Sequence, residues 1–412
     1  MLEEKLERSV EQSAAALTAM ADDFFDHPEV GLQEFHAFET LTGWLEKEGF
    51  TVERGIAGMD TAFRAVWKHG EGGPNIGLLC EYDALAGLGQ SIVLAEQADA
   101  LAGLGHACGH HMQGPAILGA AKALKDAAID APYTITVYGT PAEESISGKV
   151  MMLENGCTFE ELDVALMMHG GPATQVDVKS LALNKLKIIY HGVCSHAALK
   201  PEKGRSALDG LIMACQGVEF LREHVPSDVR MHYTIVNCGG TAANVVPGYA
   251  EASMYVRSYN RTELDGVVAR VKKVLQGAAM MTETEVEIIE EKSLDNKIPV
   301  LSLNELVMEQ AEKVKAPCIR PARQKTGSTD FGNVMRHVPG TCIRVAFVPE
   351  GAAAHSQEYL DAGKTEAAHN AVVYGAKILA LTGAQLIEDP EKLEAIKKEF
   401  HENLAKELNS QS

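Results

Sequence analysis

The segment ELDVALMMHGG, residues 161–171, decides the fold class. Its apolar run has the length of a strand and ends at His169, so it predicts a buried strand with a polar side chain at its carboxyl end. The run YTITVYGTPAEES, residues 133–145, has the same design and ends in two adjacent glutamates. Before these two strands in the sequence, GPAILGAAKALKDA at 114–127 predicts an Ala-rich helix. Helices that alternate with fully apolar strands predict an α/β fold with a mixed, mainly parallel sheet sandwiched by helices.

The rest of the chain around these segments supports the same class. Residues 1–50 are expected to be helical, and TAFRAVWK and NIGLLCEYDAL, residues 61–68 and 75–85, predict a pair of strands. Further along, TCIRVAFVP at 341–349 predicts an apolar strand, and 363–384 predicts a long Ala-rich helix. All these elements fit one large α/β domain.

A different pattern begins near residue 180. SLALNKLKIIYHGV, residues 180–193, alternates apolar and polar side chains, which is typical of a half-exposed strand. A helix, two strands, a second helix and a last strand follow, and this β-α-β-β-α-β order is typical of a ferredoxin-like α+β unit. We therefore expect a small domain at 180–293, inserted into a larger domain that is formed by 1–179 and 294–412.

Composition excludes several classes of protein. The 412 residues exceed the size of one ordinary core, which agrees with two domains. A formal net charge of −20 argues against a nucleic-acid partner, because phosphate binding needs a basic surface. No run of about 18 apolar residues occurs, so no membrane span is expected.

The cysteines and the first residues indicate a compartment. The eight cysteines are scattered and form no CxxC pair, a usage that suits a reducing environment. The opening MLEEKLERSVEQS is charged and amphipathic, without the apolar stretch of a secretory signal. We expect a cytoplasmic protein.

The loop GLGHACGHHMQG, residues 103–114, places three histidines and a cysteine among glycines. A His-rich loop formed by chance is one interpretation, and a metal site is the other. Polar side chains also follow the predicted strands, and the carboxyl ends of parallel strands meet at one edge of a sheet. The candidates are Glu81, Tyr82, Asp83, His106, Cys108, His110, His111, Glu143, Glu144, His169 and His355. Thiolate, imidazole and carboxylate together are ligands that zinc, manganese or cobalt would use, which favours a metal site.

The adjacent glutamates also allow two interpretations. Neighbouring side chains point in different directions, so one of Glu143 and Glu144 could bind metal while the other acts on substrate as a base. An isolated pair of glutamates is more often a solvated acidic loop. The apolar strand before them favours the functional interpretation.

Motifs along nearly the whole chain resemble those of the M20 metallopeptidase and amidohydrolase family. In chain order they are HPEVGLQE at 27–34, EYDALAGLGQ at 81–90, GHACGHHM at 105–112, GTPAEES at 139–145, CSHAA at 194–198, GGTAANVVPGYAEASMYVRS at 239–258, GSTDFGNV at 327–334 and AAHSQEY at 353–359. They are similar above all to the family's D branch, which includes aminobenzoyl-glutamate hydrolases and dipeptidases. The resemblance implies a zinc-exopeptidase-like fold in which the 180–293 domain is a lid and dimerisation domain.

The resemblance also implies a metal centre. Two divalent metal ions in each protomer, zinc or manganese in the first place and cobalt or nickel as alternatives, would be bridged by Cys108. The other metal ligands would be His110, Glu144, His169 and His355. Asp83 would orient His110, and Glu143 would be the general base.

Further roles are implied for the lid and the substrate pocket. His196 would reach the active site of a partner subunit, although it could instead only cap the following helix. The substrate would be held by Asn244, Arg257, Gly327, Ser328 and Asp330. Arg257 is the candidate partner of a substrate carboxylate, with a surface or interface salt bridge as an equal alternative.

Some positions depart from the family pattern. Ala86 stands where the family usually has proline, and we expect only a softer turn. His111 stands where the branch usually has Asp or Asn, and it could be an extra ligand, a donor behind the ligands or an exposed residue. His106 is interpreted as a packing group or a group behind the ligands. The interval Ser91–Leu101 fits the family's loop poorly, so specificity could differ there.

The implied activity is hydrolysis of an amide bond in a small carboxylate-bearing substrate, such as a dipeptide, an N-acyl amino acid or an aminobenzoyl-glutamate type compound. The protomers would form a homodimer or homotetramer through the lid. Two alternatives stay open. A non-catalytic binding protein on the same scaffold is opposed by the presence of Cys108, Glu143 and His196. A hydrolytic deaminase acting on an aromatic amine is the other, although the HxE and PCxxC signature of zinc nucleoside deaminases is absent.

Overall fold

The computed structural model describes residues 2–86 and 103–409. The chain divides into two compact units. Unit 1 comprises Met1–Lys179, Lys297–Thr326 and Asn333–Leu404, and unit 2 comprises Ser180–Asn296, Gly327–Gly332 and Ala405–Ser412. Each unit has its own cluster of buried apolar side chains, so each is described by itself.

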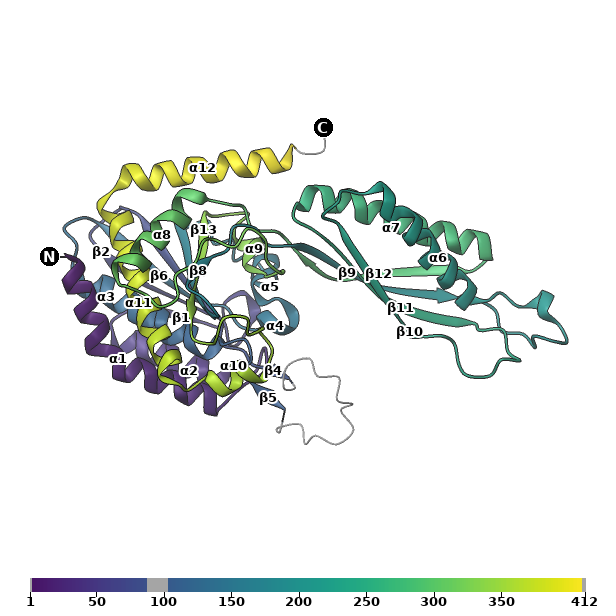
Figure 1. The fold of residues 1–412 in the computed structure, drawn as a ribbon, viewed down its shortest axis with the longest axis horizontal. Helices are drawn as coiled ribbons and strands as arrows, with labels where there is room; N and C mark the ends of the chain where they lie inside the picture. Colours follow the sequence, from purple (N-terminus) through teal and green to yellow (C-terminus); the bar gives the residue numbers. More distant parts are fainter. Residues whose placement is uncertain (1, 87–102, 410–412) are drawn as a thin grey trace. The chain divides into compact units, whose positions relative to one another are not determined.

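Unit 1 contains a seven-stranded sheet with the order β1-β2-β6-β3-β7-β13-β8 (Figure 1). The strands are β1 Thr51–Arg54, β2 Phe63–His69, β3 Asn75–Cys80, β6 Tyr133–Gly139, β7 Val164–Gly171, β8 Gln175–Val176 and β13 Gly340–Ala346. Strands β6, β3, β7 and β13 run parallel, whereas β1, β2 and β8 are antiparallel to their neighbours. This mixed, mainly parallel sheet confirms the predicted fold class. A separate two-stranded sheet joins β4 Leu85–Ala86 to β5 Leu104–Gly105.

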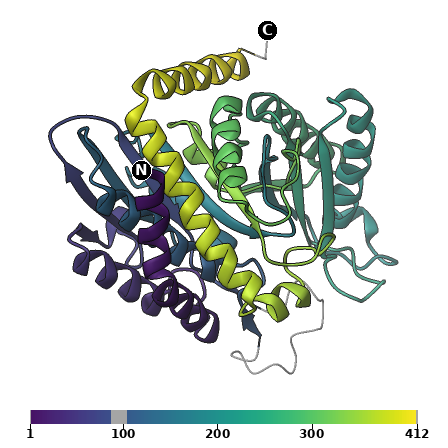
Figure 2. The ribbon, with the colours of Figure 1, turned by 60° about the vertical axis from the view of Figure 1, so that its left-hand side comes forward.

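Three long helices pack together on one face of this sheet. They are α1 Leu2–Asp26, α3 Gln113–Ala127 and α11 Glu366–Glu388, and α1 and α11 run side by side (Figure 2). Because strand side chains alternate between faces, Leu166 and Met168 of β7 join this core, whereas Met167 lies on the opposite face. On that opposite face Tyr138 of β6 contacts Phe159, with ring centroids 4.8 Å apart. The remaining helices are α2 Phe35–Lys47, α4 Glu143–Ile146, α5 Gly148–Glu154, α8 Leu301–Lys313, α9 Phe331–Val334, α10 Gln357–Ala362 and α12 Pro390–Leu408.

Among the described residues, α11 alone is long and apolar enough to cross a membrane. Its apolar window is 72% buried inside the protein. Side chains such as Val372 and Leu379 are fully buried in the core shared with α1 and α3. Packing in the core of unit 1 therefore accounts for its apolar composition.

Unit 2 contains a four-stranded antiparallel sheet with the order β10-β11-β9-β12. Its elements are β9 Ala182–His191, α6 Ala207–Leu221, β10 Arg230–Asn237, β11 Tyr249–Ser258, α7 Arg261–Thr282 and β12 Glu285–Leu294. Ser206 and Asn260 cap the two helices by accepting hydrogen bonds from Asp209 N–H and Glu263 N–H. The β-α-β-β-α-β order and the single antiparallel sheet confirm the predicted ferredoxin-like unit.

Two details differ from the expectations from sequence. The segments 61–68 and 75–85 do contain strands, but β6 lies between β2 and β3, because the crossover through α3 places β6 parallel to β3. Strand β9 is not half-exposed, since it lies between β11 and β12 and most of its side chains are buried. Its alternating lysines, Lys185 and Lys187, are only partly exposed and pair with Glu291 and Glu251.

Candidate active site

Acidic, thiol and imidazole side chains of unit 1 gather at the carboxyl edge of its parallel strands. Asp83 follows β3, Glu143 and Glu144 open the helix after β6, and His169 lies near the end of β7. His355 follows β13, and its backbone N–H donates to Ala107 O in the loop that precedes α3. The parallel topology thus brings together residues that are up to 272 positions apart, from Asp83 to His355.

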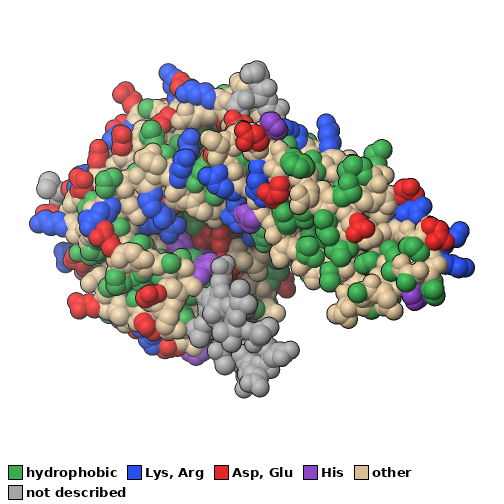
Figure 3. All heavy atoms as spheres, turned by 45° about the vertical axis from the view of Figure 1, so that its right-hand side comes forward, with side chains coloured by type: hydrophobic (Ala, Val, Ile, Leu, Met, Phe, Trp, Pro, Cys, Tyr) green, Lys and Arg blue, Asp and Glu red, His purple; other side chains and the backbone are tan. Residues whose placement is uncertain are grey.

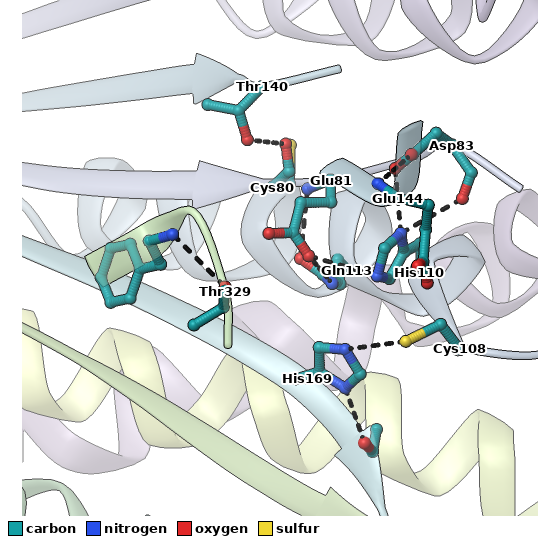
Figure 4. Close-up of polar contacts among 12 residues, drawn as sticks. Cys80, Glu81, Asp83, Cys108, His110, Gln113, Thr140, Glu144, His169 and Thr329 are labelled. Atoms are coloured by element: carbon teal, nitrogen blue, oxygen red, sulfur yellow. Dashed lines mark hydrogen bonds and ion pairs between the residues drawn. The ribbon is translucent and has the colours of Figure 1, made fainter. Parts of the chain in front are cut away.

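Cys108 lies at the centre of this group. Its Sγ is 3.5 Å from His169 Nε2. Cys108, His110 and His169 form one group whose donor atoms all lie within 4.8 Å of one another, and Cys108, Glu144 and His355 form a second. Figure 4 shows Cys108 and His110, from one loop, close to His169 of β7. One thiol is therefore shared by two sets of three donors.

Gly109 makes the close placement of Cys108 and His110 possible. Its φ of 83° lies in the left-handed region that side-chain-bearing residues rarely adopt. A Cβ at this position would lie 3.0 Å from Met112 Cε and close to the ring of Phe347. Glycine therefore satisfies both the turn and the packing here.

Asp83 fixes two parts of the site with one buried carboxylate. Its Oδ1 lies 3.0 Å from His110 Nδ1, and its Oδ2 accepts the backbone N–H of Glu144 at 2.9 Å. When His110 Nδ1 carries the proton toward Asp83, its Nε2 keeps a free lone pair on the side of the donor cluster. The geometry therefore supports the orienting role that the resemblance implies for Asp83.

Glu34 is a site residue that the sequence reasoning missed. Its Oε1 accepts the backbone N–H of Ala142 at 2.8 Å, and its Oε2 accepts the Thr61 hydroxyl at 2.9 Å. Ala142 has a φ of 61°, an uncommon conformation immediately before Glu143. Glu34 and Asp83 thus hold the backbone on both sides of Glu143, and burial raises the pKa of Glu34 to about 7. The available signal was its place in the HPEVGLQE block, for which no role was predicted.

A second missed group is the buried ion pair of Glu81 and Lys149. Lys149 Nζ lies 2.5 Å from Glu81 Oε1, and both side chains are almost fully buried. Gln113 donates its amide to Glu81 Oε2, which also lies 3.3 Å from His110 Nε2. Burial opposes ionisation of Glu81, but Lys149 and then His110 hold its pKa below the usual range. A lone lysine early in a short helix carries no sequence signal of burial.

The charges of the donors balance one another. Burial and Glu144 oppose ionisation of Cys108, yet His110 and His169 bring the pKa of the thiol down to about 6. Hydrogen bonds with Cys108 and Glu144 raise the pKa of His355 to about 10. Protons on imidazoles therefore compensate the thiolate and carboxylate, and a divalent cation bound by the same donors would replace those protons. The donor set of one thiolate, three imidazoles and carboxylates fits such ions.

His111 and His106 belong to the same loop as Cys108 and His110 but to none of the donor groups among the described residues. His111 is fully buried, its Nε2 lies 2.9 Å from Gly363 O, and its ring packs edge-on against Phe25. It is neither exposed nor part of the donor groups around Cys108, and burial lowers its pKa to about 4. His106 is buried beside it, with ring centroids 5.2 Å apart, as expected of a packing group. Ala86 ends β4, and Ser91–Leu101 lies outside the described residues.

The other predicted residues belong to unit 2. His196 pairs with Val245 in a short antiparallel bridge, and Ala197 N–H donates to Asn244 O, so the His196 and Asn244 segments are neighbours. Arg257 donates to Ser328 Oγ at 3.3 Å and lies over the ring of Tyr255. Among the described residues Arg257 makes no ion pair, so a surface salt bridge within the chain is not observed. Gly327, Ser328 and Asp330 group with unit 2.

Comparison with known proteins decides the family. The model of Peptidase family M20/M25/M40 matches residues 81–381. The chain belongs to this family. One similar relative is a p-aminobenzoyl-glutamate hydrolase chain of Escherichia coli (strain K12), 31% identical over 96% of this chain and 94% of the relative. Another is the Xaa-Arg dipeptidase of Mus musculus, 32% identical over 99% of this chain and 94% of the relative.

A solved M20 structure agrees with this assignment at the level of the fold. The YXEP protein of Bacillus subtilis, described as a dinuclear metal-binding peptidase, is 21% identical and covers 92% of this chain and 99% of its own, with a TM-score of 0.68. This M20 chain is a hydrolase of C–N bonds of the metallopeptidase and amidohydrolase type. The comparisons favour neither a non-catalytic binding protein nor an aromatic deaminase.

Proposed function

We propose that this M20 enzyme hydrolyses the amide bond of a small carboxylate-bearing substrate at a two-metal centre formed around Cys108. The observation that carries the proposal is the position of Cys108 in two groups of three donors, each within 4.8 Å. One group would complete a site with His110 and His169, and the other with Glu144 and His355. When bound, the two divalent ions would supply a nucleophilic water at neutral pH and polarise the substrate carbonyl.

Glu143 would act as the general base. It opens α4, and its carboxylate lies within 4.8 Å of the donor atoms of His110 and Glu144. Glu143 would take the proton of the attacking water and then pass it to the leaving amine, which is a poor leaving group until it is protonated. Glu34 and Asp83 would keep its backbone in place, because they accept the N–H groups of Ala142 and Glu144.

His196 would donate a hydrogen bond to the oxyanion that develops during attack, an interaction that strengthens in the transition state. His196 would come from the partner chain of a homodimer or homotetramer. The proposed lid and dimerisation domain, 180–293, contains His196 and lies in the sequence between the two proposed catalytic parts, 1–179 and 294–412. Unit 2 supports an interface, because Phe220, Met280 and Met281 are 74%, 82% and 66% exposed. Figure 3 shows hydrophobic side chains gathered over this unit.

Strand β10 of unit 2 supports the same interface. It lies at one edge of its sheet, and Ile235 and Val236 are 44% and 58% exposed. An edge strand offers unpaired backbone groups to a second chain.

The proposed location of the enzyme is the cytoplasm, where reduced Cys108 is retained.

The substrate would be a dipeptide, an N-acyl amino acid or a p-aminobenzoyl-glutamate type amide. The names of the two relatives support this range, since one refers to p-aminobenzoyl-glutamate and the other to Xaa-Arg dipeptides. Arg257 would pair with the substrate carboxylate, because its guanidinium is bonded only to a hydroxyl and its buried Nε has no partner in the described part of unit 2. Asn244, Gly327, Ser328 and Asp330 would line the same pocket.

The test is a product screen with metal-reconstituted enzyme. Zn²⁺- and Mn²⁺-loaded protein is incubated with p-aminobenzoyl-glutamate, Xaa-Arg and other dipeptides and N-acyl amino acids, and products are identified by mass spectrometry. We expect a free amine and a free carboxylate in equal amounts from at least one class, and none with Glu143→Gln. No hydrolysis of any class by the loaded wild type would contradict the proposed substrates. Release of ammonia without cleavage would indicate a deaminase.

A further inference from the structure

A second cluster of metal-binding side chains lies in unit 1, separate from the Cys108 group. It consists of Asp23 in the last turn of α1, His27 just after that helix, and His36 in the first turn of α2. His27 Nδ1 is 3.1 Å from Asp23 Oδ1, and His36 Nε2 is 2.6 Å from Asp23 Oδ2. Three donor atoms on three residues lie within 4.8 Å of one another. The side chains are 39%, 62% and 43% exposed, so an ion in solution can reach them.

The backbone around the cluster is fixed by other contacts. Glu29 accepts the N–H groups of His36 and Ala37 through its two carboxylate oxygens, at 2.8 and 3.0 Å, and so caps the start of α2. Phe24 packs edge-on against the His36 ring, and the His27 and His36 rings are 5.1 Å apart. The donors are therefore held near one another without an ion, which lowers the entropy lost on binding one.

The charge at this end of α1 favours a cation. The carboxyl end of a helix carries partial negative charge, yet the last turn of α1, fully described, holds acidic residues and no basic one. Asp22 pairs with His369 and Asp26 with Lys364. The described partners of the Asp23 carboxylate are only the two imidazoles, and His27 Nδ1 also lies 2.9 Å from the Asp23 backbone oxygen. His27 and His36 each place an imidazole nitrogen against the Asp23 carboxylate, and neutral imidazole is the form that binds metal.

We infer that Asp23, His27 and His36 form a surface site for a divalent transition-metal ion such as Zn²⁺, Cu²⁺ or Ni²⁺. Two imidazoles and one carboxylate suit these ions better than Mg²⁺ or Ca²⁺, which take oxygen ligands. Donor atoms around a tetrahedral zinc ion lie about 3.3 Å apart, given metal–ligand bonds of about 2.0–2.1 Å. Because the donor atoms already lie within 4.8 Å of one another, they reach this spacing by changes of about 1.5 Å or less, which exposed side chains make by rotation. Water would complete the shell.

The ion at this site would connect the end of α1 to the start of α2. It would take no part in hydrolysis, since none of its ligands belongs to the donor groups around Cys108. Its effect would be on stability, because an ion that binds only the folded chain raises the melting temperature. The site would give a role to His27 of the HPEVGLQE motif and to His36 just after it, which have no place in the proposed catalytic chemistry.

The test compares the full-length, metal-loaded wild type with three variants. His36→Gln and Asp23→Asn remove one donor each while keeping side-chain size. His337→Gln is the matched control, because His337 Nδ1 also faces a single carboxylate, Glu160, at 3.3 Å but has no second imidazole partner among the described residues. Bound zinc is counted by equilibrium dialysis against micromolar Zn²⁺ and elemental analysis, and the melting temperature is followed with and without added zinc.

We expect wild type and His337→Gln to bind one more zinc ion per chain than His36→Gln and Asp23→Asn, with the same hydrolytic activity in all four. The melting temperature of wild type should rise further with added zinc than that of the two donor variants. Equal zinc counts in all four proteins would overturn the inference and leave the cluster as a set of hydrogen bonds. Melting in excess chelator shows that each variant folds, and His27→Gln replaces a variant that does not.

Discussion

The sheets of the two units place their functional side chains in opposite ways. In unit 1 the proposed catalytic side chains follow buried parallel strands or lie in the loop before α3. Buried carboxylates fix this site, since Asp83 faces His110 and Glu34 accepts the backbone N–H of Ala142. In unit 2 His196 lies in an exposed segment, and large apolar side chains such as Phe220 face solvent. Contacts within unit 1 therefore fix its proposed reactive groups, whereas the exposed apolar side chains of unit 2 have the character expected of the proposed interface.

Removal of the shared thiol should have the largest effect. Cys108→Ala takes one donor from both groups of three, so we expect loss of at least one metal ion and of nearly all activity. The fold should survive, because Cys108 is in a loop and only partly buried. Elemental analysis and circular dichroism check both statements. Full metal occupancy in this variant would show that Cys108 does not bridge.

Replacement of the proposed base separates chemistry from binding in unit 1. Glu143→Gln keeps the shape of the side chain but cannot accept a proton, so kcat should fall by about 10² or more. Metal content and KM should stay close to those of wild type. Steady-state kinetics beside elemental analysis measure the split. Near-normal kcat would move the base to another residue, with Glu144 as the next candidate.

The buried Glu34 should make the stability of unit 1 depend on pH. Its pKa is raised by burial from 4.5 to about 7, so the folded state holds a proton that the unfolded state has already lost. The stability that this proton provides is complete below about pH 4.5 and is lost as the pH rises to about 7, on the order of 3 kcal/mol in all. Glu34→Gln should lack this dependence.

Urea unfolding of metal-free protein, with excess chelator in every sample, measures this effect. The pH values run from near the ordinary glutamate pKa to about one unit above the raised pKa of Glu34. Subtracting the curve of Glu34→Gln from that of wild type removes the contribution of other groups. Parallel curves for the two proteins would mean that Glu34 is ionised in the folded state over this whole range.

Subunit exchange tests whether unit 2 serves a second chain. Glu143→Gln and His196→Ala should each be nearly inactive alone. In a mixed dimer, one of the two sites would combine an intact Glu143 with an intact His196 from the other chain. About half of the sites in mixed dimers should therefore regain activity. Native mass spectrometry confirms the exchange. Exchange without recovery would show that His196 acts within its own chain or has no catalytic role.

The smallest effect on folding is expected for the exposed face of unit 2. Phe220→Ser changes a side chain that is 74% exposed, so the free energy of unfolding of the isolated chain should change by no more than about 0.5 kcal/mol. If this face contacts a partner, light scattering should show a weaker oligomer. An unchanged oligomer would exclude Phe220 from the interface.

The sequence predicted the architecture well because the periodicity of each segment and the order of helices and strands along the chain can be read locally. The apolar run at 161–171 became β7, and the alternation after residue 180 became the antiparallel sheet of the second unit. The predicted pairing of the strand at 61–68 with the strand at 75–85 was wrong, since pairing depends on the path of the chain between strands. The roles of the candidate site residues and the proposed domain ranges stay predictions.

The sequence could not show which charged side chains are buried. Lysine side chains are usually exposed, yet tertiary packing buries Lys149 against Glu81 with no access to solvent. Glu34 binds the backbone of a residue 108 positions away, a contact that no local pattern encodes. His111 faces Gly363 for the same reason, because a helix end far along the chain supplies its acceptor.

The acidity of Cys108 has a consequence for handling the enzyme. A thiol whose pKa is about 6 is mostly ionised at neutral pH, and the thiolate is the form that alkylating agents and peroxide attack. Before its ions are loaded, the chain therefore carries a partly accessible nucleophile at its most important position. Oxidation of this one sulfur atom would remove the ligand shared by both donor groups, so early loading of the ions should protect the site as well as complete it.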